Sequence, residues 1–168
     1  MLVYLGIFGA KVVEVSLATL RIVLINRGQK LLGSIIGFFE VLIWLFVVNL
    51  VLTDVTEDFM KVVVYCFAFS CGNYIGSTIE EKLAIGMSVI EVLIEADKSE
   101  DLAEILRQNG YGVTTIGSSG KEKKMAIIKV FLKRRSIPDA HGIIVKNYPE
   151  SIVSVSDVKK IVGGYIKK

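Results

Sequence analysis

One apolar run limits what this chain can fold into more than any other feature. Residues 31–52 read LLGSIIGFFEVLIWLFVVNLVL and contain a single formal charge, Glu40. A helix of about twenty-two residues is long enough to cross a hydrocarbon core of roughly 30 Å. Glu40 lies near the middle of that length, where its carboxylate is expected to face other helices and not lipid. The run therefore predicts a membrane-spanning helix with a buried acid.

Two further segments are expected to span the membrane, residues 2–25 and 59–79. The first of them carries Lys11, Glu14 and Arg21 on one helical face. Because charge is costly in lipid, this stripe should face neighbouring helices or a water-filled cavity. Lys11 and Glu14 can pair at i, i+3 spacing. Together with Glu40 the stripe forms a membrane charge site, in which Lys11 and Arg21 are expected to set the pKa of Glu40.

Two interpretations of this charge site stay open. Glu40 either binds an ion or carries a proton, or it belongs to a structural ion pair that locks the helix register.

Small residues at four-residue spacing recur in each expected span. The pairs are Gly6 with Ala10, Gly33 with Gly37, and Gly72 with Gly76. Such pairs let helices pack closely, either within one chain or between subunits. Because three spans enclose little interior in which charges can be sheltered, we expect a homo-oligomer.

The connections between the spans differ in charge, which predicts the orientation of the chain. The first connection carries two basic residues, Arg27 and Lys30, and no acidic residue. The second connection carries three acidic residues, Asp54, Glu57 and Asp58, and no basic residue. Positive charge favours the cytoplasmic side. The N-terminus is therefore expected outside the cell membrane and the C-terminal half in the cytoplasm.

The charge of the chain is concentrated after residue 79, which predicts a domain boundary. Residues 80–168 hold fifteen of the 20 Lys and Arg residues and twelve of the 17 Asp and Glu residues. We expect a transmembrane domain over residues 1–86 and a cytosolic domain over residues 87–168. Two glutamates lie at the junction, Glu80 and Glu81. They either belong to a solvated helix end, bind a cation, or pair at the membrane interface with Arg27 and Lys30.

The second half of the sequence alternates strand and helix patterns in the order βαββαβ. Strands are expected at residues 87–95, 111–117, 125–132 and 152–155. Helices are expected from Ser99, an N-cap, to Gly110 and over residues 137–146, followed by a short helical or irregular tail. This order is that of an α+β, ferredoxin-like domain in which a helix pair covers one sheet face. The other face would need a partner, such as another subunit.

Several runs of the sequence resemble a family of bacterial membrane proteins, uncharacterised protein family 0316. They are Thr19-Leu20-Arg21, Arg27-Gly28, the run from Gly37 to Trp44, the run from Gly72 to Gly76, and the run from Ile79 to Gly86. The resemblance implies a three-span domain joined to a cytosolic domain that also forms the tail of YitT-type membrane proteins. That tail is similar in fold to PII-type signalling proteins, which trimerise and bind small nucleotides between subunits. The resemblance implies no established activity.

Residues suited to catalysis or metal binding do not form a recognisable set. No nucleophile with a base and no loop of P-loop spacing is present, so we do not expect an enzyme. Two cysteines and one histidine cannot make a structural zinc site, and neither a metal nor a cofactor is expected. The net charge of +3 is too small to indicate nucleic-acid binding.

Two basic runs in the second half are candidates for binding anions. The first consists of Lys121, Lys123 and Lys124, and the second of Lys133, Arg134 and Arg135. Each run is either a solvated turn or strand end, or a contact for a nucleotide phosphate. The second run is also suited to lipid head groups.

Two functions are compatible with these features. The first is a small oligomeric channel or transporter for an ion or small solute, regulated by a ligand-sensing cytosolic domain. The alternative is a membrane-anchored nucleotide sensor or scaffold without transport. Membrane lipid, further copies of the chain and a small nucleotide are the expected partners.

Overall fold

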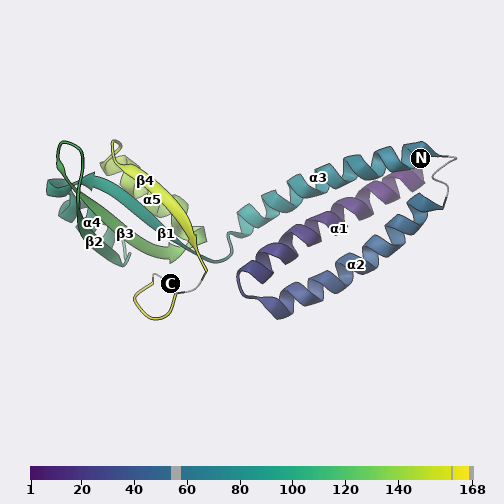
Figure 1. The fold of residues 1–168 in the computed structure, drawn as a ribbon, viewed down its shortest axis with the longest axis horizontal. Coiled ribbons are helices and arrows are strands. Elements are labelled where there is room, and N and C mark those ends of the chain that lie inside the picture. The colour runs from purple at the N-terminus through teal and green to yellow at the C-terminus, as the bar shows by residue number, and fades with distance from the viewer. Residues whose placement is uncertain (54–57, 160, 167–168) are drawn as a thin grey trace. The chain divides into compact units, whose positions relative to one another are not determined.

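The computed structural model describes residues 1–53, 58–159 and 161–166. The chain divides into two compact units, Met1–Leu83 and Ala84–Lys168 (Figure 1). This division falls three residues before the expected domain boundary between residues 86 and 87. Asp54 and Glu57, two acids of the second connection, lie outside the described residues.

The described part of the first unit consists of three long helices, α1 (Leu2–Asn26), α2 (Lys30–Leu52) and α3 (Phe59–Leu83). Both α2 and α3 are long and apolar enough to cross a membrane. Helix α1 is 25 residues long but carries three charges, Lys11, Glu14 and Arg21. Helix α3 continues past the expected end of its membrane span at Ile79, as a helix end containing Glu80 and Glu81 requires, and stops where Ala84 takes a φ of +43° and Gly86 a φ of +111°.

Helix α1 packs against both other helices, and glycines make its contact with α2 close. A Cβ added at Gly33 would lie 2.6 Å from Ile25 Cγ1. A Cβ added at Gly37 would lie 3.0 Å from Cδ of Arg21, whose side chain passes this position. The absence of side chains at these two positions therefore lets α1 and α2 approach each other.

The second glycine pair, Gly72 and Gly76, lies on α3 and packs against α1. A Cβ added at Gly72 would lie 2.7 Å from Val15 Cβ and 3.1 Å from the carbonyl oxygen of Val12. A Cβ at Gly76 would lie 3.0 Å from Ser16 Cα. Ser16 Oγ also donates a hydrogen bond to the Gly72 carbonyl oxygen at 3.2 Å. Both of these glycine pairs thus serve helix packing within one chain.

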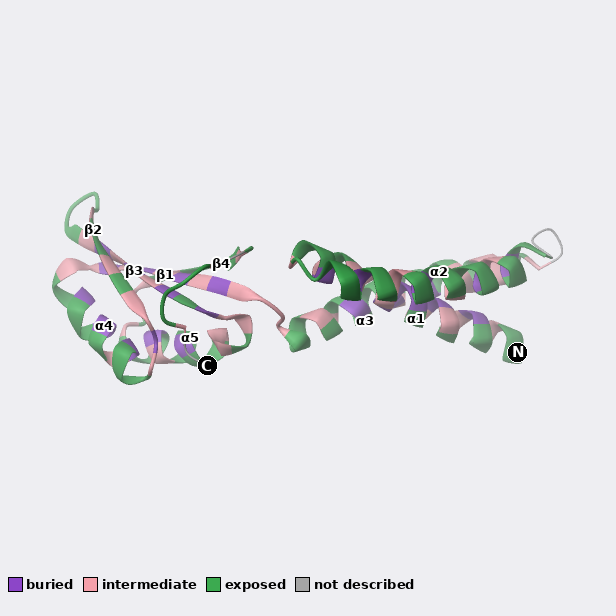
Figure 2. Ribbon diagram, turned by 90° about the horizontal axis from the view of Figure 1, so that it is seen from below, coloured by how far each residue is buried: buried purple, intermediate pink, exposed green. Residues whose placement is uncertain are grey.

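Much of the helical unit is exposed (Figure 2), and its exposed residues include many large hydrophobic side chains whereas several charged side chains are buried, the reverse of a soluble protein. Large hydrophobic side chains of α2 and α3 are exposed, among them Phe38, Phe39, Phe46, Phe59 and Phe67. Lys11, Glu14 and Glu40 are buried. The Cβ positions of Gly6 and Gly9 on α1 are open. An apolar exterior of this size is typical of a surface that contacts lipid or another protein.

The second unit alternates strands and helices in the expected order βαββαβ. Its strands are β1 (Met87–Glu95), β2 (Val113–Ser119), β3 (Lys124–Lys133) and β4 (Ile152–Val158). Its helices are α4 (Ser99–Gln108) and α5 (Ile137–Asn147), each preceded by a short 3-10 turn. Pro138 lies in the first turn of α5, where its missing N–H has no helical acceptor to lose.

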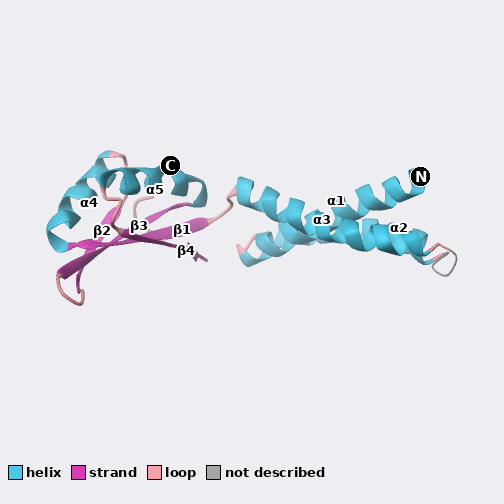
Figure 3. Cartoon of the chain, turned by 90° about the horizontal axis from the view of Figure 1, so that it is seen from above, coloured by secondary structure: helices cyan, strands magenta, loops and turns pink. Residues whose placement is uncertain are grey.

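The described strands form one antiparallel sheet in the order β2–β3–β1–β4. On the central strand β1, Val92 lies opposite Ile128 of β3 and Val153 of β4. Figure 3 shows α4 and α5 on the same face of this sheet. Two split βαβ units joined in this way make a ferredoxin-like fold, as the sequence predicts.

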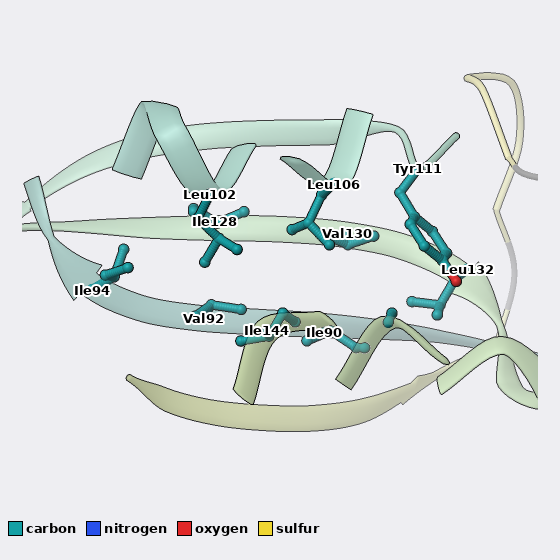
Figure 4. Close-up of a cluster of buried hydrophobic side chains, with 11 residues drawn as sticks. Ile90, Val92, Ile94, Leu102, Leu106, Tyr111, Ile128, Val130, Leu132 and Ile144 are labelled. Atoms are coloured by element: carbon teal, nitrogen blue, oxygen red, sulfur yellow. The ribbon is translucent and has the colours of Figure 1, made fainter. Parts of the chain in front are cut away.

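Alternate strand residues fill the space between the sheet and its two helices (Figure 4). Burial along β1 alternates residue by residue, as the period of two in a strand requires. The cluster contains side chains from β1, α4, β3 and α5, among them Ile90, Val92, Leu102, Leu106, Ile128, Val130 and Ile144.

Three details of the second unit differ from the sequence prediction. Ser99 is not an N-cap, because its Oγ donates to the Ala96 carbonyl oxygen at 2.7 Å in the turn before α4. β2 begins at Val113, two residues later than expected, after the turn made by Gly110 at φ +81°. β4 extends to Val158, three residues beyond its expected end, and the described residues after it, 159 and 161–166, are irregular, which is one of the two alternatives expected for the tail.

The close approach of α3 to α1 makes Gly72 intolerant of a methyl group. Gly72→Ala is expected to lower the free energy of unfolding by about 1–3 kcal/mol, because the added Cβ overlaps Val15 and the backbone at Val12. Gly9→Ala is the matched control, since nothing lies within 4 Å of its Cβ position. It should be neutral or stabilising by up to about 1 kcal/mol. Thermal unfolding of the full-length protein in detergent measures both, and equal melting temperatures would contradict this packing.

Candidate functional site

The first candidate site is the charged stripe of the helical unit, where Arg21 of α1 meets Glu40 of α2. Arg21 Nε lies 2.6 Å from Glu40 Oε2, and Arg21 Nη2 lies 3.2 Å from Glu40 Oε1. The Glu40 side chain is 12% exposed and that of Arg21 33% exposed. A planar guanidinium that binds a carboxylate through two nitrogens fixes orientation as well as charge. The pair therefore holds α1 and α2 in one register.

Lys11 and Glu14 form a second ion pair, within α1. Lys11 Nζ lies 2.5 Å from Glu14 Oε2, and both side chains are buried. The same ammonium group lies 4.3 Å from the ring centroid of Tyr65 and 5.6 Å from that of Phe69, both on α3. Cation–π attraction of this kind strengthens when the cation is removed from water. Lys11 thus links its own helix to α3.

The two pairs are separate, which corrects the expectation that Lys11 and Arg21 together set the pKa of Glu40. Arg21 pairs with Glu40, whereas Lys11 pairs with Glu14. Ten residues of helix separate the two bases, about 15 Å along α1. The four charges therefore neutralise one another locally and inside one chain, and sheltering them does not require a second subunit.

The charged residues predicted at the membrane interface lie at helix ends. Arg27 follows α1 and Lys30 begins α2, whereas Glu80 and Glu81 lie in the last turn of α3. Arg27 and Glu80 are half-buried and interact with other residues, while Lys30 and Glu81 are exposed. Pairing between these bases and acids stays a prediction.

The second candidate site is a cavity of about 440 Å³ in the α+β unit. It arises because the pairing of β4 with β1 begins at Ile152, opposite Leu93, two residues short of the end of β1. The loop before β4 is held toward α4 instead, where the Tyr148 hydroxyl donates a hydrogen bond to the Asp101 carboxylate. The cavity lies between this loop and the end of β1, and its lining includes Leu93, Ile94, Met125, Asn147, Pro149, Glu150 and Ile152.

Three charged residues line this cavity, Glu95, Glu150 and Lys98. Glu95 Oε1 lies 2.6 Å from Lys123 Nζ, and Oε2 lies 3.1 Å from Lys98 Nζ. Hydrogen bonds from Lys123 and then Lys98 hold the pKa of the Glu95 carboxyl below its usual range, and Glu95 raises the pKa of Lys123. The hydrogen bond to Asp101 raises the pKa of Tyr148, so the phenol keeps its proton. At neutral pH the site therefore holds one carboxylate bridging two ammonium groups.

A second cavity of about 440 Å³ also borders Glu95, and Lys123 and Lys124 contribute to its lining. These are two of the three lysines in the first predicted basic run, and Lys121 is exposed on the hairpin. The second run, Lys133, Arg134 and Arg135, begins at the opposite end of β3. A strand of this length separates the two runs by roughly 30 Å, so they do not form one site.

Sequence reasoning missed Glu95, Lys98 and the segment 147–152 as parts of a site. Their proximity depends on where the pairing of β4 with β1 begins, which no local pattern specifies. The available signal was the run Asn147-Tyr-Pro-Glu-Ser between the last helix and the last strand. It combines an aromatic residue with strong turn formers at a strand end.

The chain combines a helical unit, with two helices apolar enough to span a membrane, and an α+β unit with a cavity. These features are typical of a membrane-associated protein with a folded α+β domain. A family model described as a domain of unknown function (DUF5698) matches residues 19–77. The UPF0316 protein of Clostridium botulinum strain Hall is 48% identical over 164 residues, which cover 96% of this chain and 95% of the relative. The UPF0316 protein of Acetivibrio thermocellus is 33% identical over 161 residues, covering 96% and 78%. The chain belongs to the UPF0316 family, which confirms the resemblance seen in its sequence.

Solved structures similar to this chain match about half of it. One is CPII from Thiomonas intermedia K12 bound to ADP, AMP and acetate, with 18% identity, a TM-score of 0.43, and coverage of 49% of this chain and 97% of that one. Another is a putative PII-like signalling protein from Thermus thermophilus, with 16% identity, a TM-score of 0.40, and coverage of 44% and 87%. These similarities are low, and the ferredoxin-like assignment rests on the order and register of the strands.

Removing Glu40 alone should destabilise the helical unit more than removing the whole ion pair. Glu40→Leu leaves the Arg21 guanidinium without its partner, and we expect a loss of about 2–4 kcal/mol in unfolding free energy. The double variant Arg21→Leu/Glu40→Leu has no unpaired charge and should lose less. Unfolding of the full-length protein in detergent measures both. A double variant that loses as much stability as Glu40→Leu, or more, would contradict direct pairing.

Proposed function

We propose that this protein is a membrane-anchored sensor whose α+β unit binds a small nucleotide at the cavity next to Glu95. One observation carries the proposal: a cavity of about 440 Å³ combines an apolar wall with the Lys98 ammonium group, and Lys123, which lines the neighbouring cavity, binds the same Glu95 carboxylate. Ligand pockets are typically about 300–1,000 Å³, mostly apolar, with a few polar groups that fix orientation. A nucleotide presents the two matching surfaces, a planar base and a phosphate.

The lysines around Glu95 are suited to the phosphate part of such a ligand. Lys98 and Lys123 already bind the Glu95 carboxylate, and Lys124 lines the neighbouring cavity. A phosphate oxygen is an acceptor of the same kind as a carboxylate oxygen, so it can take over the hydrogen bonds that Glu95 accepts. Glu95 therefore acts as a competitor that an anionic ligand must displace.

In the proposed arrangement all three helices of the first unit span the membrane. Two of them are apolar enough by themselves, and the charges of α1 are paired, one of them with Glu40 of α2. Arg27 and Lys30 favour the cytoplasmic side for the connection between α1 and α2. The proposed orientation has the N-terminus outside and the α+β unit in the cytoplasm.

Transport of an ion or small solute is a second candidate function, favoured by the buried carboxylates of Glu14 and Glu40. The pairing of each carboxylate with a base at 2.5–2.6 Å supports a structural role for both. Flux across liposomes that is lost in Glu40→Gln would establish transport. Oligomeric assembly belongs to this candidate function as a further prediction.

Nucleotide binding by the full-length protein in detergent tests the proposed function. The ligands are ATP, AMP, cyclic di-AMP and inorganic phosphate, each measured by thermal shift and calorimetry. At a concentration one hundred times the Kd, a ligand stabilises by about 2.7 kcal/mol. We expect at least one nucleotide to bind, more tightly in Glu95→Gln because the competing carboxylate is gone.

Two lysine variants decide whether binding occurs at this cavity. Lys98→Ala/Lys123→Ala should abolish the shift, because both ammonium groups that bridge Glu95 are removed. Lys133→Ala is the matched control at the far end of β3 and should leave the shift unchanged. The proposal fails if none of the four ligands binds, or if binding survives in the Lys98→Ala/Lys123→Ala variant.

A further inference from the structure

One face of the α+β sheet carries no helix, and its side chains form ordered rows across the strands. Figure 3 shows both helices on the opposite face. The strand register places four apolar residues side by side in one row, Ile152, Leu93, Ile127 and Ile116. Of these, Ile152 is 65% and Ile116 44% exposed. A second apolar row contains Val89 and Phe131. Apolar rows that remain this accessible indicate an interaction surface.

A polar row runs between the two apolar rows. It consists of Ser154, Glu91, Lys129 and Thr114, one residue from each strand. Lys129 Nζ lies 2.7 Å from Glu91 Oε1, and both side chains are about one-third exposed, 34% and 38%. The open face therefore has an opposite pair of charges at its centre with apolar residues on both sides.

We propose that this open sheet face is the surface on which a second copy of the chain packs, sheet against sheet. A closed pair of identical subunits has a two-fold axis, so the surface must be complementary to itself. An axis parallel to the strands, running between β1 and β3, meets this requirement. It sets each row of one copy against the same row of the other, so that apolar side chains face apolar side chains.

The charges of the polar row fit the same axis. Because β1 of one copy then faces β3 of the other, Glu91 lies opposite Lys129 of the second copy, and Lys129 lies opposite its Glu91. Each charge acquires an opposite charge across the interface in addition to its neighbour on the same sheet. The strands of both copies run in the same direction, so both chains enter their sheets from the same side, as two copies anchored in one membrane must.

The size of the face is adequate for such a contact. Four strands with seven paired residues measure about 19 Å by 23 Å, so two copies would cover roughly 900 Å² of sheet. Specific interfaces begin at about 1,000 Å² of accessible surface, and projecting side chains add to the flat area. Aligned packing of two sheets at about −30° is a common arrangement.

Charge reversal in the full-length protein tests this surface. E91K gives each copy two positive charges in the polar row, and K129E gives each copy two negative charges. We expect wild-type protein to form dimers in detergent and each variant alone to associate at least about tenfold more weakly, because like charges meet across the interface. A mixture of E91K and K129E should restore dimers, since opposite charges then face each other. Light scattering and co-purification of two differently tagged copies measure this.

The mixture distinguishes a contact between two copies from an effect within one chain. Both variants lose the Glu91–Lys129 ion pair within their own sheet, so only opposite charges across the interface can restore the dimer. Glu104→Lys, an equal charge change on exposed α4, is the control and should associate as the wild type does. Melting temperatures within a few degrees of the wild type show that the variants remain folded. The proposal is wrong if wild-type protein is monomeric, if E91K associates as the wild type does, or if the mixture fails to restore dimers.

Discussion

The ion pair between Arg21 and Glu40 is the constraint on which the helical unit depends. A carboxylate near the middle of an apolar helix must find a counter-charge on another helix, and a bidentate guanidinium fixes both rotation and register. Gly37 provides the space through which the Arg21 side chain reaches it. Because one face of α1 packs against α2, the glycines of α3 pack against another face of α1, which includes Ser16. One electrostatic requirement therefore orients both contacts that α1 makes, with α2 and with α3.

Structural features that depend on a local pattern of residues can be predicted from this sequence. Features that depend on how separate helices or strands are placed against one another cannot. The Lys11–Glu14 pair is predictable because i, i+3 spacing determines it. The sequence alone does not decide whether Glu40 pairs with Lys11 or Arg21, since the relative depth of two helices depends on the turn between them and on their tilt. The βαββαβ order follows from alternating apolar residues, but β4 extends past its expected end at Val155 to Val158, through the two consecutive polar residues Ser156 and Asp157. The cavity beside Glu95 depends on the point where β4 begins to pair with β1.

The open sheet face and the cavity share residues, which has a thermodynamic consequence. Leu93 and Ile152 belong to the apolar row and also line the cavity. If a nucleotide and a second copy of the chain both bind as proposed, both contact Leu93 and Ile152. Linkage then requires that the ligand change the dimerisation constant by the same factor by which dimerisation changes ligand affinity. Ligand binding and assembly could thus report on one another without any movement of the helical unit.

The position of the counter-charge also bears on how the chain is made. Arg21 precedes Glu40 by 19 residues, so the ribosome completes α1 before the residue that neutralises it exists. A lone helix with three charges partitions poorly into lipid during translocation. Together with α2 it becomes a hairpin whose buried charges cancel, joined by the short basic turn at Arg27. In the proposed three-span arrangement the first two helices are therefore suited to leave the translocation machinery as a pair.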